Sequence, residues 1–304
     1  MRHIYTLGET VLDILFRNNL PVSAIAGGSM LNTAIALGRT GCKVDFISEF
    51  GKDDPGNVIE KSLSDNHVST IHSIRYQHFN TSIALAFLDD RQNAQYTFYH
   101  NQPAELPDNA PPAFTQNDIL AFGSFYSVRP ARRKHVSTIT ETAKKAGALI
   151  IFDPNVRKHH LADMPSVRDV FFENMSLSHI VKGSNEDFEF LAGTSEPESI
   201  YEKLKPYCTN LVITQGEGNI LLFTPSLIKE YAVPPISPVS TIGAGDNFTA
   251  GLIYGFAEKN LTKSRLDKLT EKEWDTLISR GTAFATATCL SMENYVPAGF
   301  NPNL

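Results

Sequence analysis

The chain has 304 residues and a formal net charge of -6, with 42% hydrophobic and 20% charged residues. These values are typical of a globular protein and argue against a nucleic-acid-binding surface, because no stretch is densely basic. No apolar run is long enough to span a bilayer and the N-terminus is not typical of a signal peptide, so we expect a cytoplasmic protein without a membrane partner. The three cysteines lack metal-ligand spacing and are expected to be buried thiols.

Residues 3–16 are apolar and β-branched enough to predict a buried strand, interrupted at Gly8 and Glu9. Asp13 lies within this stretch, between two apolar residues. Because burying an acid without partners is costly, Asp13 is either exposed at a strand end or directed at a polar ligand.

Residues 27–41 predict a tight turn at Gly27 and Gly28 followed by a helix of small residues. Ser29 is a candidate N-cap of this helix. Asn32 falls in the first turn, where asparagine is a mediocre helix former. Contact with a ligand and simple capping are equal alternatives for its side chain.

Residues 43–66 predict a strand followed by a helix with a proline in its first turn. The pattern then changes, because residues 82–88 and 96–99 predict an antiparallel hairpin with no helix between its strands. We expect a small β-sheet lid formed by approximately residues 14–26 and 68–102.

From residue 118 onward, short apolar strands alternate with helical stretches. The predicted strands are 119–122, 149–152, 180–182, 211–214, 219–224 and 228–233, and the predicted helices are 130–146, 166–175, 184–207 and 272–290. Crossover helices imply a mainly parallel central sheet with helices on both faces, a three-layer α/β fold. We predict one domain over residues 1–304, with ligands at the carboxyl ends of the strands, where residues 153–157 and 214–218 lie.

Residues 240–251, Ser-Thr-Ile-Gly-Ala-Gly-Asp-Asn-Phe-Thr-Ala-Gly, predict a glycine-rich loop that opens a helix. The first N–H groups of a helix lack internal partners and lie at the positive end of its dipole, so Gly243, Ala244 and Gly245 can hold a phosphate. Asp246 either caps this helix or accepts a proton from a hydroxyl that attacks phosphorus, and the local pattern favours neither alternative.

Two other kinds of site lack their motifs. Gly216 and Gly218 are not followed by the third glycine of the dinucleotide fingerprint, and the GxxxxGK[ST] phosphate loop does not occur. His159 and His160 are adjacent rather than spaced to share one metal ion, which is typical of a surface loop. The phosphate loop is therefore of another kind.

These motifs resemble, in the same order, those of the ribokinase-like, PfkB-type carbohydrate kinases. The glycine turn with Asn32 and the stretch 241–251 are similar to the two signatures of that family. Asp13, the lid and residues 153–155 extend the resemblance over nearly the whole chain. The resemblance implies a ribokinase-like fold and an enzyme that uses ATP and Mg²⁺ to transfer the γ-phosphoryl group to a sugar hydroxymethyl group.

The resemblance also implies roles for individual residues. Asp246 would be the catalytic base, with Gly243, Ala244 and Gly245 as the anion hole, and Arg157 would face the reacting centre unless it is an ordinary surface arginine. The implied sugar-binding residues are Asp13, Gly27, Gly28, Asn32, Phe98 and Asp153. The implied nucleotide-binding residues are Ser184, Thr214, Gly216, Gly218, Thr241, Ala283 and Ala287, with a plain hairpin turn as the alternative for the two glycines.

The chain departs from the family pattern in two places. Where the family has Asn-x-x-Glu near Mg²⁺ and the phosphates, this chain has Ser184-Asn185-Glu186-Asp187, and we take Asp187 as the metal-side acid with Glu186 as the second choice. Ser240 stands where an aspartate often helps to hold a monovalent cation, so activation by K⁺ is doubtful.

Residues 153–157, Asp-Pro-Asn-Val-Arg, and Ser184 make the chain most similar to fructokinases, so the predicted activity is that of a fructokinase acting on a sugar and ATP. The alternatives are a ribokinase, a 2-keto-3-deoxygluconate kinase, a nucleoside kinase and a sugar-binding regulator without catalysis. A hairpin that projects from a larger domain exposes an apolar face, so Ile83, Leu85 and Phe87 predict a homodimer through the lid.

Overall fold

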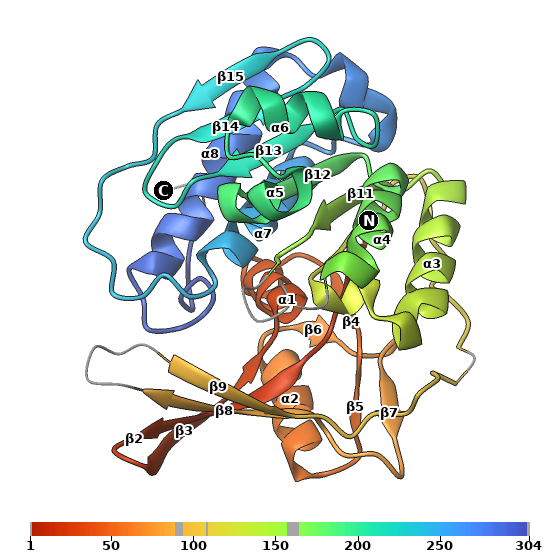
Figure 1. The fold of residues 1–304 in the computed structure, drawn as a ribbon, viewed down its shortest axis with the longest axis vertical. Helices are drawn as coiled ribbons and strands as arrows, with labels where there is room; N and C mark the ends of the chain where they lie inside the picture. The colour runs from red at the N-terminus through yellow and green to blue at the C-terminus, as the bar shows by residue number, and fades with distance from the viewer. Residues whose placement is uncertain (1, 89–93, 108, 157–163, 303–304) are drawn as a thin grey trace.

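The computed structural model describes residues 2–88, 94–107, 109–156 and 164–302. In this part of the chain nine strands form the central sheet, in the order β15-β14-β13-β12-β11-β10-β1-β4-β6 (Figure 1). The strands are β1 (Ile4–Leu7), β4 (Val44–Ile47), β6 (Val68–Ser69), β10 (Ile119–Gly123), β11 (Leu149–Asp153), β12 (Ile180–Ser184), β13 (Leu211–Thr214), β14 (Ile220–Phe223) and β15 (Ile228–Tyr231). Neighbours from β6 to β13 pair in parallel, and β14 pairs antiparallel with both β13 and β15.

Helices cover both faces of the central sheet and bury two separate groups of apolar side chains. On one face lie α1 (Ser29–Arg39), α2 (Asp54–Asp65), α7 (Ala244–Glu258) and α8 (Glu271–Cys289). On the other lie α3 (Pro130–Lys145), α4 (Met164–Leu177), α5 (Asn185–Ala192) and α6 (Pro197–Leu204). Strands buried on both faces need apolar side chains at successive positions, as β10 and β11 have. The predicted three-layer α/β fold is confirmed.

A second sheet of four strands, in the order β3-β2-β8-β9, forms the lid. Its strands are β2 (Val11–Arg17), β3 (Leu20–Gly27), β8 (Ile83–Leu88) and β9 (Ala94–Tyr99), and β3 leads directly into α1 (Figure 1). Not all of the range predicted for the lid belongs to it. β6 joins the central sheet, and β7 (Ile74–Tyr76) pairs with β5 (Glu49–Gly51) in a separate two-stranded sheet.

The stretch 184–207, predicted as one helix, is two helices. Ser184 is the last residue of β12 and the N-cap of α5. Gly193 ends α5 with a φ of 68°. A residue in this left-handed conformation cannot continue a right-handed helix, so the chain restarts as α6.

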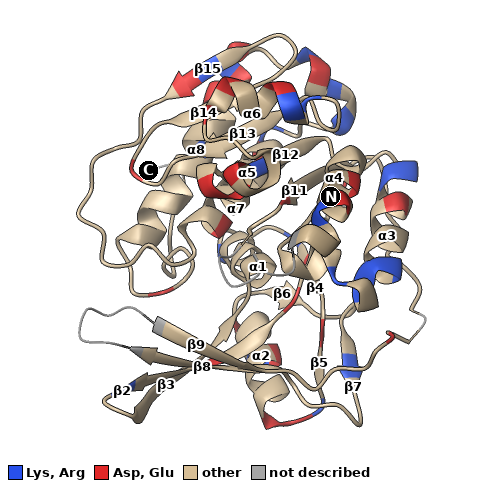
Figure 2. Cartoon of the chain, in the orientation of Figure 1, with Lys and Arg blue, Asp and Glu red and all other residues tan. Residues whose placement is uncertain are grey.

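Charged residues of both signs are mixed over the surface elements. Figure 2 shows Lys and Arg on α3 and at the end of the molecule that holds α6 and β15, with Asp and Glu among them. Within the described residues, no helix is both long and apolar enough to cross a membrane. Cys208 is buried, whereas Cys42 and Cys289 are half-buried, and all three are free thiols.

Candidate active site

The start of α7 has the backbone geometry of an anion site. Gly243 is the N-cap of this helix and has a φ of 80°, in the left-handed region. A Cβ atom there would lie 2.1 Å from the carbonyl oxygen of Asn294, so only glycine fits. Because Gly243 has no side chain, none caps the first turn of α7. The N–H of Ala244 bonds to the carbonyl of Thr241 at 3.3 Å, and intrahelical bonding begins with the N–H of Asn247.

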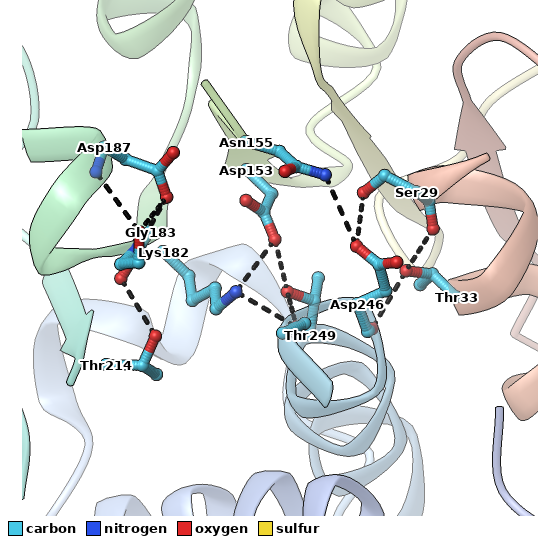
Figure 3. A network of polar contacts seen from close by, with 12 residues as sticks. Ser29, Thr33, Asp153, Asn155, Lys182, Gly183, Asp187, Thr214, Asp246 and Thr249 are labelled. Atoms are coloured by element: carbon cyan, nitrogen blue, oxygen red, sulfur yellow. Dashed lines mark hydrogen bonds and ion pairs between the residues drawn. The ribbon is translucent and has the colours of Figure 1, made fainter. Parts of the chain in front are cut away.

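Asp246 is the third residue of α7, and its carboxylate turns toward α1 (Figure 3). Ser29 Oγ donates to Oδ1 at 2.6 Å and Asn32 Nδ2 donates to Oδ2 at 2.8 Å. Asn155 Nδ2 lies 3.5 Å from Oδ1. The residue is only 5% exposed. Because Gly243 is the N-cap, Asp246 does not cap the helix, and neutral donors from two other segments hold its carboxylate in place.

The start of α1 supplies two of the donors to Asp246, and the prediction that Ser29 caps this helix is wrong. Gly28, with a φ of 136°, is the N-cap of α1, so Ser29 is a helical residue whose hydroxyl goes to Asp246 instead of capping. The amide oxygen of Asn32 is buried and has no hydrogen-bond partner among the described residues. A buried acceptor of this kind fits a ligand hydroxyl.

The lid carries two more of the predicted residues. A Cβ atom on Gly27 would lie 2.1 Å from Asp13 Oδ2, so the Asp13 carboxylate passes directly over that glycine at the start of α1. Asp13 pairs in register with Ala84, and Ala84 pairs with Phe98. Directly paired residues project from the same face of a sheet, so Asp13 and Phe98 share one face of the lid.

Asp153, predicted to bind the sugar, lies beneath the first turn of α7 and is 2% exposed. Its Oδ2 accepts from Lys182 Nζ at 3.1 Å and from Thr249 Oγ1 at 2.8 Å (Figure 3). Lys182 also donates to the carbonyl oxygen of Gly245 at 3.0 Å. Lys182 and Thr249 were not anticipated. A lysine inside the apolar strand β12 was the available signal, because a buried lysine needs a charged partner.

At the start of α5, Ser184 and Asp187 form a capping box. Asp187 Oδ2 accepts from the Ser184 N–H and hydroxyl, both at 2.7 Å, and its Oδ1 accepts from the Val156 N–H at 2.6 Å. Burial raises the pKa of the Asp187 carboxyl, and the negative charge of Asp153 raises it further. Both oxygens of Asp187 therefore accept hydrogen bonds from the nearby backbone or from the N-cap residue.

The fit of Mg²⁺ was tested against the two acids predicted for it. Glu186 is exposed, whereas Asp187 is buried with both oxygens bonded. The residues that the structure describes hold no group of three or more His, Cys, Asp or Glu side chains able to bind a metal ion. Magnesium commonly keeps several waters and is held by substrate phosphates with one or two carboxylates, so it does not require such a group.

The residues predicted for the nucleotide lie on three segments. Thr214 ends β13 and donates to the Gly183 carbonyl at 3.3 Å. Gly216, with a φ of 63°, stands in a turn closed by a bond from the Gly218 N–H to the carbonyl of Gln215. These glycines thus make a tight turn at the carboxyl end of β13, beside β12.

The third segment is α8 with the loop before α7. Ala283 and Ala287 are half-buried and lie one turn apart on α8. The carbonyl of Cys289, the last residue of that helix, accepts from the N–H of Ser240 at 3.3 Å, directly before Thr241. The loop that leads to Gly243 is therefore tethered to α8. Arg157 lies outside the described residues.

One hollow lies away from these residues. It measures about 210 Å³ and is lined in part by Ser178, His179, Lys205 and Asp267. Ser178 and His179 directly precede β12, so the hollow lies by the amino end of that strand, whereas Ser184 and Thr214 lie at carboxyl ends. None of the predicted site residues lines it. The candidate site is therefore defined by convergent side chains and a helix terminus.

This fold, with a buried acid beside an uncapped helix N-terminus, defines an α/β phosphotransferase. Comparison with known proteins gives the family. The family model described as pfkB family carbohydrate kinase matches residues 17–298. The chain belongs to this family and is a carbohydrate kinase.

Its relatives include enzymes with different substrates. It is 27% identical to a fructokinase from Klebsiella pneumoniae over 84% of each chain. It is 23% identical to an aminoimidazole riboside kinase from Salmonella typhimurium, over 86% of this chain and 82% of that one. Its fold matches that of a fructokinase mutant from Vibrio cholerae O395 bound to fructose, ADP and potassium, with a TM-score of 0.85, 21% identity, and coverage of 97% of this chain and 94% of that chain.

Proposed function

We propose that this carbohydrate kinase uses ATP to phosphorylate a hydroxymethyl group of fructose. The observation that carries the proposal is the Asp246 carboxylate, held by Ser29 and Asn32 in the first turn of a glycine-capped helix. In this proposal the base takes the proton of the attacking hydroxyl, and the phosphate binds at the helix terminus beside it. Fructose is favoured because fructokinases from several bacteria are among the relatives.

The proposed transfer forms one bond and breaks one. The sugar hydroxyl oxygen attacks the γ-phosphorus while its proton passes to an oxygen of Asp246, and the bond from the γ-phosphorus to the β,γ-bridging oxygen breaks to release ADP. The N–H groups at the start of α7 stabilise the charge on the phosphoryl oxygens, with Ala244 and Gly245 as the anion hole. Arg157 is proposed to face the same oxygens.

The sugar is proposed to bind between the start of α1 and the lid. Asp13 can accept from two hydroxyls, and the unpartnered amide oxygen of Asn32 can accept from a third. Gly27 and Gly28 let the ligand approach the backbone. Phe98 would cover the apolar face of the sugar and help the lid to exclude water, which competes with the sugar as acceptor.

The nucleotide is proposed to be ATP with Mg²⁺. A fructokinase structure from Xylella fastidiosa contains bound ATP, which supports the first part. Mg²⁺ would be held mainly by the phosphates and water, with Glu186 as the exposed acid in the first turn of α5. The ion would neutralise phosphate charge. The Vibrio cholerae structure contains potassium, but Ser240 makes K⁺ dependence doubtful here. Equal rates with K⁺ and with tetramethylammonium would support independence.

A kinase assay over a panel of acceptors tests the substrate. We expect ADP release with fructose to exceed that with ribose, 2-keto-3-deoxygluconate and aminoimidazole riboside. The riboside is included because of the Salmonella relative. Turnover of another acceptor but not of fructose would reject the fructose assignment and leave the kinase mechanism in place. Absence of turnover with every acceptor would favour a sugar-binding regulator, which has no need for a base beside an anion site.

We also propose that two copies pair through the lid. Leu20 is 68% exposed and Val22 is 54% exposed on β3, and Phe87 on β8 stacks on Phe16, which pairs with Pro21 of β3. Exposed apolar side chains gathered on one small sheet mark an interface. Sedimentation at about micromolar concentration is expected to give a dimer of the 33.6 kDa chain. A single monomeric species would contradict this assembly.

A further inference from the structure

Lys182 is a buried charge that the mechanism above does not use. It is the third residue of β12, between Val181 and Gly183, and its side chain is only 4% exposed. An ammonium group in such surroundings requires a partner of opposite charge. The partner is Asp153, whose side chain is 2% exposed and whose Oδ2 lies 3.1 Å from Lys182 Nζ. Replacing such a pair by apolar side chains is often neutral or stabilising, so stability alone does not account for it.

The second contact of Lys182 points to catalysis. Its Nζ donates to the carbonyl oxygen of Gly245, the second residue of α7, at 3.0 Å (Figure 3). A Cβ atom at Gly245 would lie 3.2 Å from Nζ, closer than a Cβ normally comes. The missing side chain of Gly245 thus lets the ammonium approach the helix backbone. Thr249 contacts the same two oxygens as Lys182, because its Oγ1 lies 2.8 Å from Asp153 Oδ2 and 3.2 Å from the Gly245 oxygen.

The peptide that Lys182 binds is the one that leads into Asp246. In a planar trans peptide the C=O and the following N–H point in opposite directions, so a bond that fixes the Gly245 carbonyl also fixes the direction of the Asp246 N–H. A charged donor polarises this peptide and strengthens its N–H as a donor. The anchor matters because Gly243 and Gly245, on either side of the first residue of α7, have no Cβ and can adopt more backbone conformations than other residues.

We propose that Lys182, paired with Asp153, is a positioning residue for phosphoryl transfer. It holds the Gly245–Asp246 peptide so that the N–H groups of the first turn face the transferring phosphoryl group and the Asp246 carboxylate stays against the acceptor hydroxyl. Lys182 reaches this peptide from the sheet side of α7, whereas Ser29 and Asn32 reach the carboxylate from α1. The inference rests on the proposed function, in which α7 binds the phosphoryl group.

The test compares Lys182→Met, the double variant Asp153→Asn with Lys182→Met, and the wild type. The double variant leaves no unpaired buried charge, which protects the fold. Lys203→Met is the matched control, because Lys203 also donates to a backbone carbonyl, that of Ala192 at 2.8 Å, but at the end of α5. We expect both Lys182 variants to lose kcat by about 100-fold, the size of one positioned donor, with the sugar KM within about threefold of wild type. Lys203→Met should keep wild-type kcat.

A second readout does not depend on the acceptor. The shift in Tm caused by saturating ATP minus that caused by saturating ADP reports contacts with the γ-phosphate. This difference should be positive in the wild type and in Lys203→Met and should shrink in both Lys182 variants. If no acceptor on the panel is phosphorylated, the proposed function fails, and this difference still decides the role of Lys182. A double variant with wild-type kcat, or one with an unchanged ATP-over-ADP difference, would overturn the inference.

Discussion

The helices α5 and α7 place an acid at the same position and use it in opposite ways. Asp187 is the third residue of α5 and Asp246 the third of α7, and both are buried, at 6% and 5% exposed. In α5 the N-cap is Ser184, and Asp187 closes a capping box with it. In α7 the N-cap is Gly243, and the Asp246 carboxylate accepts from Ser29 and Asn32 of α1.

The difference begins with one residue. In α5 the hydroxyl oxygen of Ser184 accepts from the N–H of Asp187, and the same hydroxyl donates to the Asp187 carboxylate. The polar groups of this first turn therefore bond to one another. A glycine N-cap has no side chain, so no side chain caps the first turn of α7, and its acid bonds to another helix. The pair thus contrasts a helix terminus closed by its own capping box with the one that we propose to be catalytic.

The largest expected effect is that of Asp246→Asn. Losing a general base costs about 10²- to 10⁴-fold in rate, and we expect kcat to fall by that amount. Sugar binding, measured by calorimetry, should survive because Ser29 and Asn32 can still bond to the amide. The same substitution at Asp187 should leave kcat within about threefold. Equal losses in kcat for the two variants would contradict the different roles given to the two acids.

Gly243→Ala should have the next largest effect. Its left-handed φ of 80° and the Asn294 oxygen 2.1 Å from the added Cβ both oppose alanine, so we expect a loss of about 1–3 kcal/mol in unfolding free energy and at least a tenfold loss in kcat. Gly193→Ala is the matched control. That residue also has a positive φ, of 68°, but open space around the added atom. It should lose stability through strain alone and keep its activity.

Ser29→Ala tests the contact between α1 and α7. Removing one neutral donor to a carboxylate should lower kcat by roughly tenfold, because such bonds are worth about 1.5–3 kcal/mol and Asn32 still holds the second oxygen. The loss should appear in kcat, with little change in the affinity for ATP. Thr40→Ala is the control, because its hydroxyl bonds to carbonyls at the other end of α1, away from Asp246.

The smallest effect expected on catalysis is that of Asp187→Asn. This substitution should instead change how the unfolding free energy depends on pH. Burial raises the folded-state pKa of Asp187 above its ordinary 3.8, so folding disfavours the ionised form and the wild type loses stability as pH rises through the folded value. The unfolding free energy of wild type minus that of Asp187→Asn should therefore increase as pH falls from 7 toward 4. Denaturant midpoints across this range measure it. A large increase in the Mg²⁺ concentration needed for activity would instead assign Asp187 to the metal.

The sequence predicts this site as far as local motifs reach. Gly243, Asp246, Gly28 and Asn32 stand in short glycine-rich stretches whose backbone demands can be read directly, and the alternation of strands and crossover helices places them at one edge of a parallel sheet. The division of the stretch 184–207 at Gly193 was missed because a glycine inside a helical pattern has no unique meaning.

Contacts between distant segments were not predictable in the same way. Ser29 was interpreted as a cap because nothing local reveals that Asp246 lies 2.6 Å from its hydroxyl. Lys182 meets Asp153 because β11 and β12 are neighbours and α7 crosses them, and that depends on strand order rather than on any motif. Side-chain partners across elements therefore required the folded structure.

The most direct test of the account is a crystal structure with fructose, ADP, Mg²⁺ and aluminium fluoride, which imitates the transferring phosphoryl group. We predict fluoride atoms bonded to N–H groups in the first turn of α7, and a sugar hydroxymethyl oxygen within hydrogen-bond distance of Asp246 and in line with the aluminium. Asp187 should keep its bonds to Ser184 and Val156. Fluoride bound at the start of α5, or a sugar oxygen turned away from Asp246, would contradict the account.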